Sequence, residues 1–348
     1  MNLFFIGFRD PLFGLIVFFT LIFIITFLSY WWGKYKHKED AKYLDKFLKQ
    51  FQAPPSHDEL KILINKNEIS KKPWLLLADA YSINGNYEKS IEIYNEILKS
   101  NQSNNDRDTM FLLGQTYFKA GFLERAKQIF LEILKNNPRT PQALNSLLLV
   151  YEYMRDYDSA LEVLEPLEEL NQSVTIDTLY LKVLYILNES KFDLNLKLEK
   201  LLKIYENNNQ LTHLIFEYIF RINPKLAWNY FDKSKCDVII DILWLVDKKD
   251  LDLDIITQTS YLRELYTARG DIKLVDSSGV FEFDILINLK NKGSATLSFE
   301  YLCDNCKHIQ PFAFTRCSNC HAIDSSKIEI SLIKNYMRDF SQLNNSFQ

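Results

Sequence analysis

The sequence predicts an all-α protein in three parts: an N-terminal transmembrane helix, a solenoid of repeated helix pairs, and a small C-terminal β ribbon that binds a metal. Three observations support this prediction. An uncharged apolar stretch lies near the N-terminus, a helical motif recurs in the middle, and four of the five cysteines fall in one short window. Only 9 Gly and 9 Pro occur in 348 residues, too few for a protein rich in tight β turns.

The composition also excludes several classes of protein. Hydrophobic residues make up 47% and charged residues 25% of the chain, so it is not a disordered polypeptide. The formal net charge of −4 argues against a general nucleic-acid-binding surface. A secreted, disulfide-stapled protein would spread its cysteines along the chain. The one cysteine outside the cluster, Cys236, is expected to be a small buried hydrophobic residue.

The apolar stretch, residues 11–33, is predicted to be a single transmembrane helix. Its sequence, PLFGLIVFFTLIFIITFLSYWWG, carries no charge, and about 20 residues suffice to cross a hydrocarbon core of about 30 Å. Three aromatic residues end the stretch and three lysines follow it, namely Tyr30, Trp31, Trp32, Lys34, Lys36 and Lys38. Aromatic side chains prefer the headgroup level and lysines the cytoplasmic side, so the bulk of the chain is expected in the cytoplasm.

Two alternatives fit this stretch less well. A cleaved signal peptide would have a more positive start, a shorter apolar core and a small-residue cleavage site. A buried core helix would not usually be apolar on every face. The stretch is therefore expected to remain as an anchor. Residues 1–10 precede it as a short tail, and residues 34–70 follow it as a charged helical stem and a linker, with Pro54 and Pro55 ending the stem.

A motif in the middle of the chain recurs with steps of 36, 34, 34 and 33 residues. Each copy has a tyrosine, a small residue nine positions later, and a large apolar residue four positions after that. The tyrosines are Tyr81, Tyr117, Tyr151, Tyr185 and Tyr218. The small positions are Ser90, Ala126, Ala160, Leu194 and Ala227, and the apolar ones are Tyr94, Phe130, Leu164, Leu198 and Phe231. Leu194 is not small, so the fourth copy is predicted to be degenerate.

These copies resemble the tetratricopeptide repeat family over residues 71–235, with about five repeats of which the last two are degenerate. The first copy matches best, through Trp74, Leu77, Ala78, Tyr81, Ser90 and Tyr94. Each repeat would be a helix pair, with turns at Gly85 and Gly121, and stacked pairs would form an α-solenoid. The resemblance implies protein binding in a groove lined by the first helix of each pair. The polar candidates for that groove are Asp79, Gln115, Lys119 and Glu152.

Residues 236–293 stay apolar and helical but lose the repeat. They are predicted to form two or three helices that cap the solenoid, with Gly270 and Gly293 as helix ends. The ribbon is expected at residues 294–330, followed by a C-terminal tail at 331–348. Within the ribbon, residues 298–303 and 309–317 alternate between apolar and polar side chains as strands do.

The ribbon carries two CxxC pairs with ten residues between them: Cys303, Cys306, Cys317 and Cys320. Each pair is typical of a knuckle that points two thiolates at one ion, and two knuckles complete a tetrahedral site. Zn2+ is favoured, and iron takes the same ligand set. Four cysteines leave no open position for a substrate, so the site is expected to be structural. Basic neighbours are expected to reduce its negative charge, namely Lys307, His308, Arg316 and His321. No catalytic motif appears elsewhere, so the chain is not expected to be an enzyme.

The combination of anchor, repeats and ribbon resembles the lipopolysaccharide assembly protein B family, whose last module is rubredoxin-like. The resemblance rests on Tyr301, the four cysteines and their spacing, and on Phe312 and Phe314. It implies an adaptor in the inner membrane of Gram-negative bacteria, with its bulk in the cytoplasm. Members of the family link the membrane AAA protease FtsH to the lipid A pathway deacetylase, and so regulate lipopolysaccharide synthesis and organise its assembly. Rubredoxin-like knuckles usually carry Gly and Pro where this chain has Lys307 and Ser318.

Two other functions remain open from the sequence. A generic tetratricopeptide scaffold for another envelope complex, such as secretion, pilus or cell-wall assembly, would need the same anchor and array. Nucleic-acid binding by the ribbon would need a concentration of basic side chains. Glu300, Asp304 and Asp324 dilute the basic residues there, so this function is disfavoured.

Overall fold

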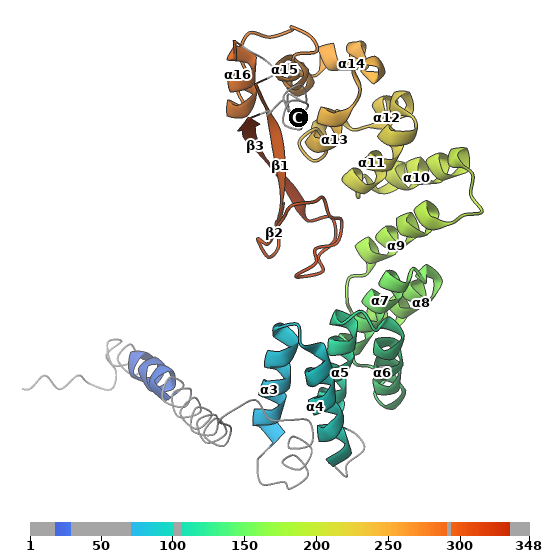
Figure 1. Ribbon diagram of the computed structural model, residues 1–348, viewed down its shortest axis with the longest axis vertical. Coiled ribbons are helices and arrows are strands. Elements are labelled where there is room, and N and C mark those ends of the chain that lie inside the picture. Colours follow the sequence, from blue (N-terminus) through green and yellow to red (C-terminus); the bar gives the residue numbers. More distant parts are fainter. Residues whose placement is uncertain (1–17, 29–70, 101–105, 291–293, 335–348) are drawn as a thin grey trace, which may run out of the picture. The chain divides into compact units, whose positions relative to one another are not determined.

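The computed structural model describes residues 18–28, 71–100, 106–290 and 294–334, which are mainly helical (Figure 1). Residues 18–28 form a helix whose apolar side chains are exposed. In these described ranges no helix is both long enough and apolar enough to span a membrane. Most of the predicted span and the whole predicted stem lie outside the described residues. The chain divides into two compact units, residues 1–154 and 155–348.

The first unit is a series of helices that pack on one another in chain order. They are α3 (Lys71–Ile83), α4 (Tyr87–Ser100), α5 (Arg107–Lys119), α6 (Leu123–Asn136) and α7 (Pro141–Met154). Each helix contacts the next one, and α5 also contacts α3 and α7. The first helices of successive pairs therefore touch, as expected for stacked helix pairs.

The residues that recur in the sequence form the core of this unit. Ser90 and Ala126 have no exposed surface, and Tyr94 and Phe130 are almost as inaccessible to water. Both predicted turns are confirmed, because Gly85 and Gly121 adopt positive φ angles of 78° and 81°. A side chain would be strained there, which explains glycine at the end of a first helix. The small residues thus let the paired helices approach closely, as the sequence predicts.

Gly114 in α5 offers a test of this close approach. A Cβ atom at this position would lie 2.7 Å from Cε1 of Phe130 and 3.2 Å from Cγ2 of Ile129. Gly114→Ala is therefore expected to lower the free energy of unfolding by about 1–3 kcal/mol, because overpacking outweighs the gain in helix propensity. Urea unfolding measures the change, with Lys119→Ala on the exposed side of the same helix as control. In a Phe130→Leu background the effect of Gly114→Ala should shrink, and stabilisation by Gly114→Ala would contradict the close packing.

The second unit contains the remaining helices and one small sheet. Its helices are α8 (Tyr157–Glu169), α9 (Thr175–Asn188), α10 (Leu194–Asn208), α11 (Thr212–Ile222), α12 (Pro224–Tyr230), η1 (Lys233–Lys235), α13 (Ile240–Leu245), η2 (Lys248–Asp250), α14 (Leu253–Gln258), α15 (Ser260–Arg269) and α16 (Phe281–Asn288). The recurring positions Ala160 and Ala227 are fully buried. Leu194 opens α10 and is 56% exposed, which confirms that the fourth copy departs from the motif.

The capping region is more finely divided than predicted. Between residues 236 and 290 the structure has four short α-helices and one 3-10 turn, where the sequence predicts two or three helices. The predicted helix end at Gly270 is confirmed by its φ angle of 88° and by its place as the C-cap of α15. Gly293 lies outside the described residues. Cys236 is buried as predicted, and burial raises the pKa of its thiol to about 12.

The sheet has the strand order β2-β1-β3, and both pairings are antiparallel. Its strands are β1 (Ala295–Cys303), β2 (Ile309–Gln310) and β3 (Ser326–Lys334). Figure 1 shows β1 and β3 side by side along their length. The prediction of β1 is confirmed. The predicted strand at 309–317 is wrong beyond Gln310, because Pro311 has no N–H for a ladder and the chain then turns into the second knuckle.

Strand β3 was not predicted, although its sequence alternates. Ile328, Ile330 and Leu332 pack against the helical core of the second unit, together with Leu297 of β1. The strand runs to Lys334, and so enters the stretch that the sequence assigns to a tail. Apolar burial along one face of the sheet therefore attaches β1 and β3 to the helices.

Candidate metal centre

The four cysteines sit on two knuckles with the same backbone pattern. Strand β1 ends at Cys303, whose N–H donates to the carbonyl of His308 at 2.9 Å. In the second knuckle the N–H of Cys317 donates to the carbonyl of Ala322, also at 2.9 Å. In each knuckle the residue after the second cysteine also donates its N–H back to the carbonyl of the first cysteine. Each CxxC pair is thus held in a tight turn by two backbone hydrogen bonds.

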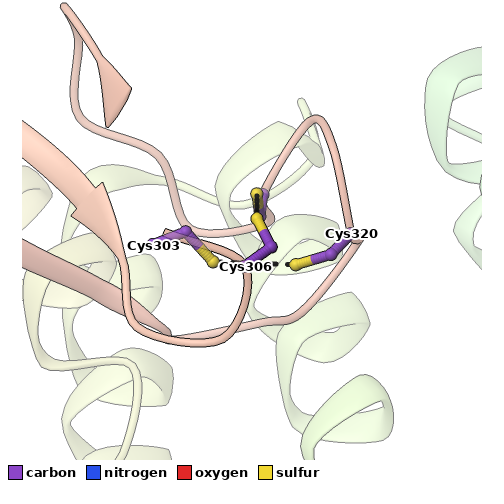
Figure 2. Close-up of side chains that lie close together, drawn as sticks. Cys303, Cys306 and Cys320 are labelled. Atoms are coloured by element: carbon purple, nitrogen blue, oxygen red, sulfur yellow. Dashed lines mark hydrogen bonds between the residues drawn. The ribbon is translucent and has the colours of Figure 1, made fainter. Parts of the chain in front are cut away.

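The sulfur atoms converge on one point, and Figure 2 shows the side chains of Cys303, Cys306 and Cys320 directed toward one another. All four Sγ atoms lie within 4.8 Å of one another. Two pairs link the knuckles, with Cys303 Sγ 3.6 Å from Cys320 Sγ and Cys306 Sγ 3.7 Å from Cys317 Sγ. A tetrahedral ion with metal–sulfur bonds of about 2.3 Å requires sulfur separations of about 3.8 Å. The donor set therefore fits one tetrahedrally bound ion.

The surroundings of the sulfur atoms favour the thiolate at some positions and oppose it at others. Burial disfavours ionisation of Cys303, yet hydrogen bonds from Ser325 and from the backbone N–H of Cys306 lower the pKa of its thiol to about 6. A hydrogen bond from Asn319 is the main cause that lowers the pKa of Cys306. Burial raises the pKa of the Cys317 thiol to about 11. An ion that binds here at neutral pH must therefore displace at least one proton.

Both knuckles carry a residue that is strained by its backbone angle. Lys307 and His321 follow the second cysteine of each pair, and their φ angles are 59° and 61°. This left-handed region favours glycine, which rubredoxin-like knuckles usually have at the first of these positions. Lys307, which stands where rubredoxin-like knuckles usually have glycine, is thus in a strained backbone conformation.

Lys307→Gly is therefore expected to raise the free energy of unfolding of the metal-loaded protein by about 0.5–1 kcal/mol. The side chain's left-handed penalty disappears, and the greater freedom of glycine in the unfolded chain offsets part of the gain. Ser318→Gly in the second knuckle is the matched control, because its φ angle is not positive and the change should destabilise. Denaturant unfolding at fixed metal concentration measures both, and equal losses for the two variants would contradict strain at Lys307.

The basic residues expected to reduce the charge of the site have other partners in part. Lys307 Nζ lies 3.4 Å from the carboxylate of Asp304. The Arg316 guanidinium bridges the ribbon and α9: Nη1 donates to the carbonyl of His321, and Nη2 lies 3.0 Å from Oδ1 of Asp177. The guanidinium also covers the Tyr180 ring at 5.1 Å. Arg316 thus makes a docking contact that the sequence did not predict, and its role in reducing the charge of the site stays a prediction. His308 and His321 lie exposed beside the knuckles.

The four candidates for a partner groove all lie in the first unit, on α3, α5 and α7. Lys119 is exposed, whereas Asp79, Gln115 and Glu152 are half-buried. The charge of Asp79 acts on a core residue: burial raises the pKa of Tyr94 to about 12, and Asp79 adds to this shift. The structure brings the four cysteines together, whereas these four polar residues are spread over three helices, with Gln115 and Lys119 one turn apart on α5. Their role in binding stays a prediction.

A buried polar cluster missed by the sequence analysis joins the ribbon to the helices. Tyr301 of β1 donates its hydroxyl to Oδ2 of Asp241 in α13 at 2.7 Å. Nε2 of His213, at the start of α11, lies 2.8 Å from the same oxygen. The rings of His213 and Tyr301 meet edge to face. Since Tyr301 and Asp241 are 60 residues apart, no local pattern could have revealed this contact.

This cluster makes the stability of the second unit depend on pH. Burial opposes ionisation of Asp241, but the hydrogen bond and charge of His213 and the hydrogen bond from Tyr301 hold the pKa of Asp241 below its usual value. A lowered folded-state pKa stabilises the fold above the unfolded value of about 3.9, and this contribution is lost as pH falls through the folded-state pKa. Denaturant unfolding between about pH 3 and 6 should show the wild type losing more stability on acidification than Asp241→Asn. Parallel curves would contradict the lowered pKa.

The described parts of the chain define a class of protein: a tetratricopeptide-like repeat array followed by a four-cysteine ribbon. A family model described as anaphase-promoting complex, cyclosome, subunit 3 matches residues 83–167, which is less than half of the chain. A search of curated proteins gives no match. The helix pairs, their buried small residues and this match agree with the tetratricopeptide resemblance. These observations support the tetratricopeptide class only; they do not show membership of the lipopolysaccharide assembly protein B family.

Several solved structures are similar to the chain. MamA (residues 41 to the end) from Desulfovibrio magneticus RS-1 is 20% identical, with a TM-score of 0.37, over 49% of this chain and 95% of that one. TTC0263, a thermophilic TPR protein of Thermus thermophilus, is 16% identical, with a TM-score of 0.30, over 56% and 98%. A tetratricopeptide repeat protein of Parabacteroides merdae is 13% identical, with a TM-score of 0.35, over 66% and 89%.

Proposed function

We propose that the chain is a membrane-anchored adaptor that binds other proteins through its helix pairs. The co-occurrence of an apolar N-terminal stretch, a tetratricopeptide-like array and a closed four-cysteine ribbon carries this proposal. Such arrays present a surface of first helices to protein partners, here α3, α5 and α7 of the first unit. Four cysteine ligands leave no coordination position for a substrate, so we infer binding rather than catalysis.

The proposed location is the bacterial inner membrane, with the bulk of the chain in the cytoplasm. Lys34, Lys36 and Lys38 after the apolar stretch support this orientation. Cell fractionation tests it: the full chain should stay in the membrane pellet after a carbonate wash, and a variant that lacks residues 11–33 should not. Release of both proteins by carbonate would overturn the anchor.

The proposed ion is Zn2+, in a structural role, with iron as the alternative that the same ligands accept. Elemental analysis of the purified protein should give one zinc per chain, and none in a protein that lacks the cysteines. One iron per chain, with the visible absorption of a thiolate-bound ferric ion, would favour the alternative.

The particular role that we propose is regulation of lipopolysaccharide synthesis, as in the lipopolysaccharide assembly protein B family. The adaptor would bring the lipid A pathway deacetylase to the membrane protease FtsH. The support for this role is the resemblance in Tyr301, the cysteine spacing and the order of the three parts. Depletion of the protein should change the half-life of the deacetylase and the lipopolysaccharide level. No change in either quantity would reject this role.

A scaffold for another envelope complex is the second candidate. The family match favours it, because that match covers only the repeat array and implies protein binding in general. Affinity capture from detergent-solubilised membranes separates the two functions. Recovery of secretion, pilus or cell-wall components without the protease or the deacetylase would select the scaffold.

A further inference from the structure

The second knuckle of the ribbon rests on α9 through one arginine. Arg316 immediately precedes Cys317, and its side chain is only 9% exposed. It pairs with Asp177 and lies over the ring of Tyr180, while Nη1 donates to the carbonyl of His321 at 3.0 Å. Asp177 and Tyr180 thus present a carboxylate and an aromatic face to one guanidinium, which is a favourable arrangement for an arginine.

The same knuckle also holds the turn between α10 and α11. Leu211 is a buried N-cap residue with a φ angle of 56°, and its N–H donates to Oδ2 of Asp324 at 3.0 Å. Asn209, two residues earlier, also has a positive φ angle. Leucine is strained in the left-handed region, so this turn needs an external contact to persist. Asp324 supplies one such contact from the ribbon, and Lys235 supplies another by donating to the carbonyl of Asn209.

The positions of Arg316 and Asp324 depend on the loop that carries Cys317 and Cys320. Arg316 and Ile323 pair as an isolated β-bridge around the second knuckle, and the N–H of Asp324 donates to the carbonyl of Thr315. The β1–β3 ladder, by contrast, is attached to the helices by its apolar face and contains only one of the four cysteines. Loss of ligation should therefore disorganise the knuckles while the ladder remains in place.

Two helix residues that contact the ribbon, Tyr180 and His213, occupy equivalent positions of the repeat. Tyr180 and His213 each lie five residues before the recurring tyrosine of their copy, Tyr185 and Tyr218. Both contact ribbon residues, Tyr180 through Arg316 and His213 through Tyr301. In α3 of the first unit the equivalent residue is Leu76, which is 49% exposed. The ribbon thus covers, in the last two copies, the row of first-helix positions that is open to solvent in the first copy.

We propose that metal binding by the four cysteines holds the second knuckle over the α9–α11 surface, and that loss of the metal uncovers an arginine-accepting site there. The uncovered site, formed by Asp177 and Tyr180, fits a peptide that presents an arginine side chain. This regulation goes beyond the proposed adaptor function and requires only that the cysteines bind a metal.

Amide hydrogen exchange on the full chain in detergent tests whether the metal holds the second knuckle on the α9–α11 surface. The N–H of Leu211 is a direct reporter, because its hydrogen-bond acceptor is Asp324. Removal of the metal by a chelator should speed its exchange about tenfold or more. Asp324→Ala, which removes the acceptor, should do so in the metal-loaded protein. Amides of the β1–β3 ladder are the internal control. Unchanged exchange at Leu211, once the amides of Lys307 and His321 have lost protection, would overturn the proposal.

Peptide binding tests the uncovered site. The probe is a fluorescent peptide with the chain's own segment 312–316, FAFTR, and its control is the same peptide with lysine in place of arginine. Chelated protein should bind the arginine peptide at least about tenfold more tightly than metal-loaded protein, and Asp177→Asn should abolish the difference. Equal affinity of the two protein forms, or equal binding of the two peptides, would overturn it. Elemental analysis of each sample separates these outcomes from a failure of metal binding itself.

Discussion

Cys303→Ser is expected to release the metal and to unfold both knuckles. Cys303 is fully buried at the end of β1, and its Sγ lies 3.6 Å from that of Cys320. A serine hydroxyl at this position is a poor ligand, and the other thiols then lose their common partner. Structural zinc sites of this kind typically contribute about 10 kcal/mol of binding free energy to folding. The effect should therefore exceed that of any single apolar substitution in the helices.

Elemental analysis and limited proteolysis measure this result together. The variant should lose its metal and be cut between Asp304 and Ser325, while the ladder of β1 and β3 stays protected by its packing on the helices. Cys236→Ala is the matched control, since it also removes one cysteine but lies far from the cluster in sequence and should keep one metal ion. A Cys303→Ser protein with full metal content and unchanged protease resistance would show that Cys303 is not a ligand.

The repeat array could be predicted because its signals are local and repeated. A small residue between two helices and a glycine at a left-handed turn each leave a mark at a fixed spacing, and Ser90, Ala126 and Gly121 behave as that spacing predicts. The cysteine cluster could also be predicted from the sequence, because two CxxC pairs are rare outside metal sites. Local steric demands and unusual residue types are thus readable from one sequence.

The attachment of the ribbon could not be predicted for the opposite reason. Arg316 and Asp177 are 139 residues apart, and Leu211 and Asp324 are 113 apart. Each is a common residue type whose ordinary interpretation is solvated surface or core packing, and only the tertiary fold pairs them. Proximity in sequence to Cys317 does not predict the ion pair of Arg316 with Asp177, because it says nothing about the direction of a long side chain.

Strand β3 was missed although its pattern was present. Ile328, Ile330 and Leu332 alternate with other residues, but the predicted ribbon ends at residue 330 and its predicted strands lie before Cys303 and Cys317. A strand pattern alone does not reveal its partner, and this one pairs back to β1 across both knuckles. The same pairing explains why the ribbon is attached firmly to the helices: it supplies the apolar face that packs on them.

Phe216→Ala is expected to cost about 3–5 kcal/mol of unfolding free energy, the largest effect of a single apolar truncation that we predict. Phe216 in α11 has no exposed surface, and its ring meets those of Tyr205, Phe231 and Phe220 at centroid distances of 4.8, 5.4 and 6.3 Å. These rings come from α10, α11 and the end of α12, so one side chain fills the centre of the last two repeats. Truncation leaves a cavity that the surrounding helices cannot close.

Phe281→Ala is the matched control, because Phe281 at the start of α16 is 72% exposed and its loss should change stability by less than about 0.5 kcal/mol. Denaturant unfolding compares the two variants, and a cycle with Tyr205→Leu should give a coupling of about 0.5–1.5 kcal/mol for the edge-to-face pair. Phe216 belongs to the same apolar cluster as Leu297 of β1, so Phe216→Ala should also weaken protection of the ribbon strands from exchange. Similar losses for Phe216→Ala and Phe281→Ala would show that the helices re-close around the cavity and that Phe216 does not hold the repeats and the sheet in one core.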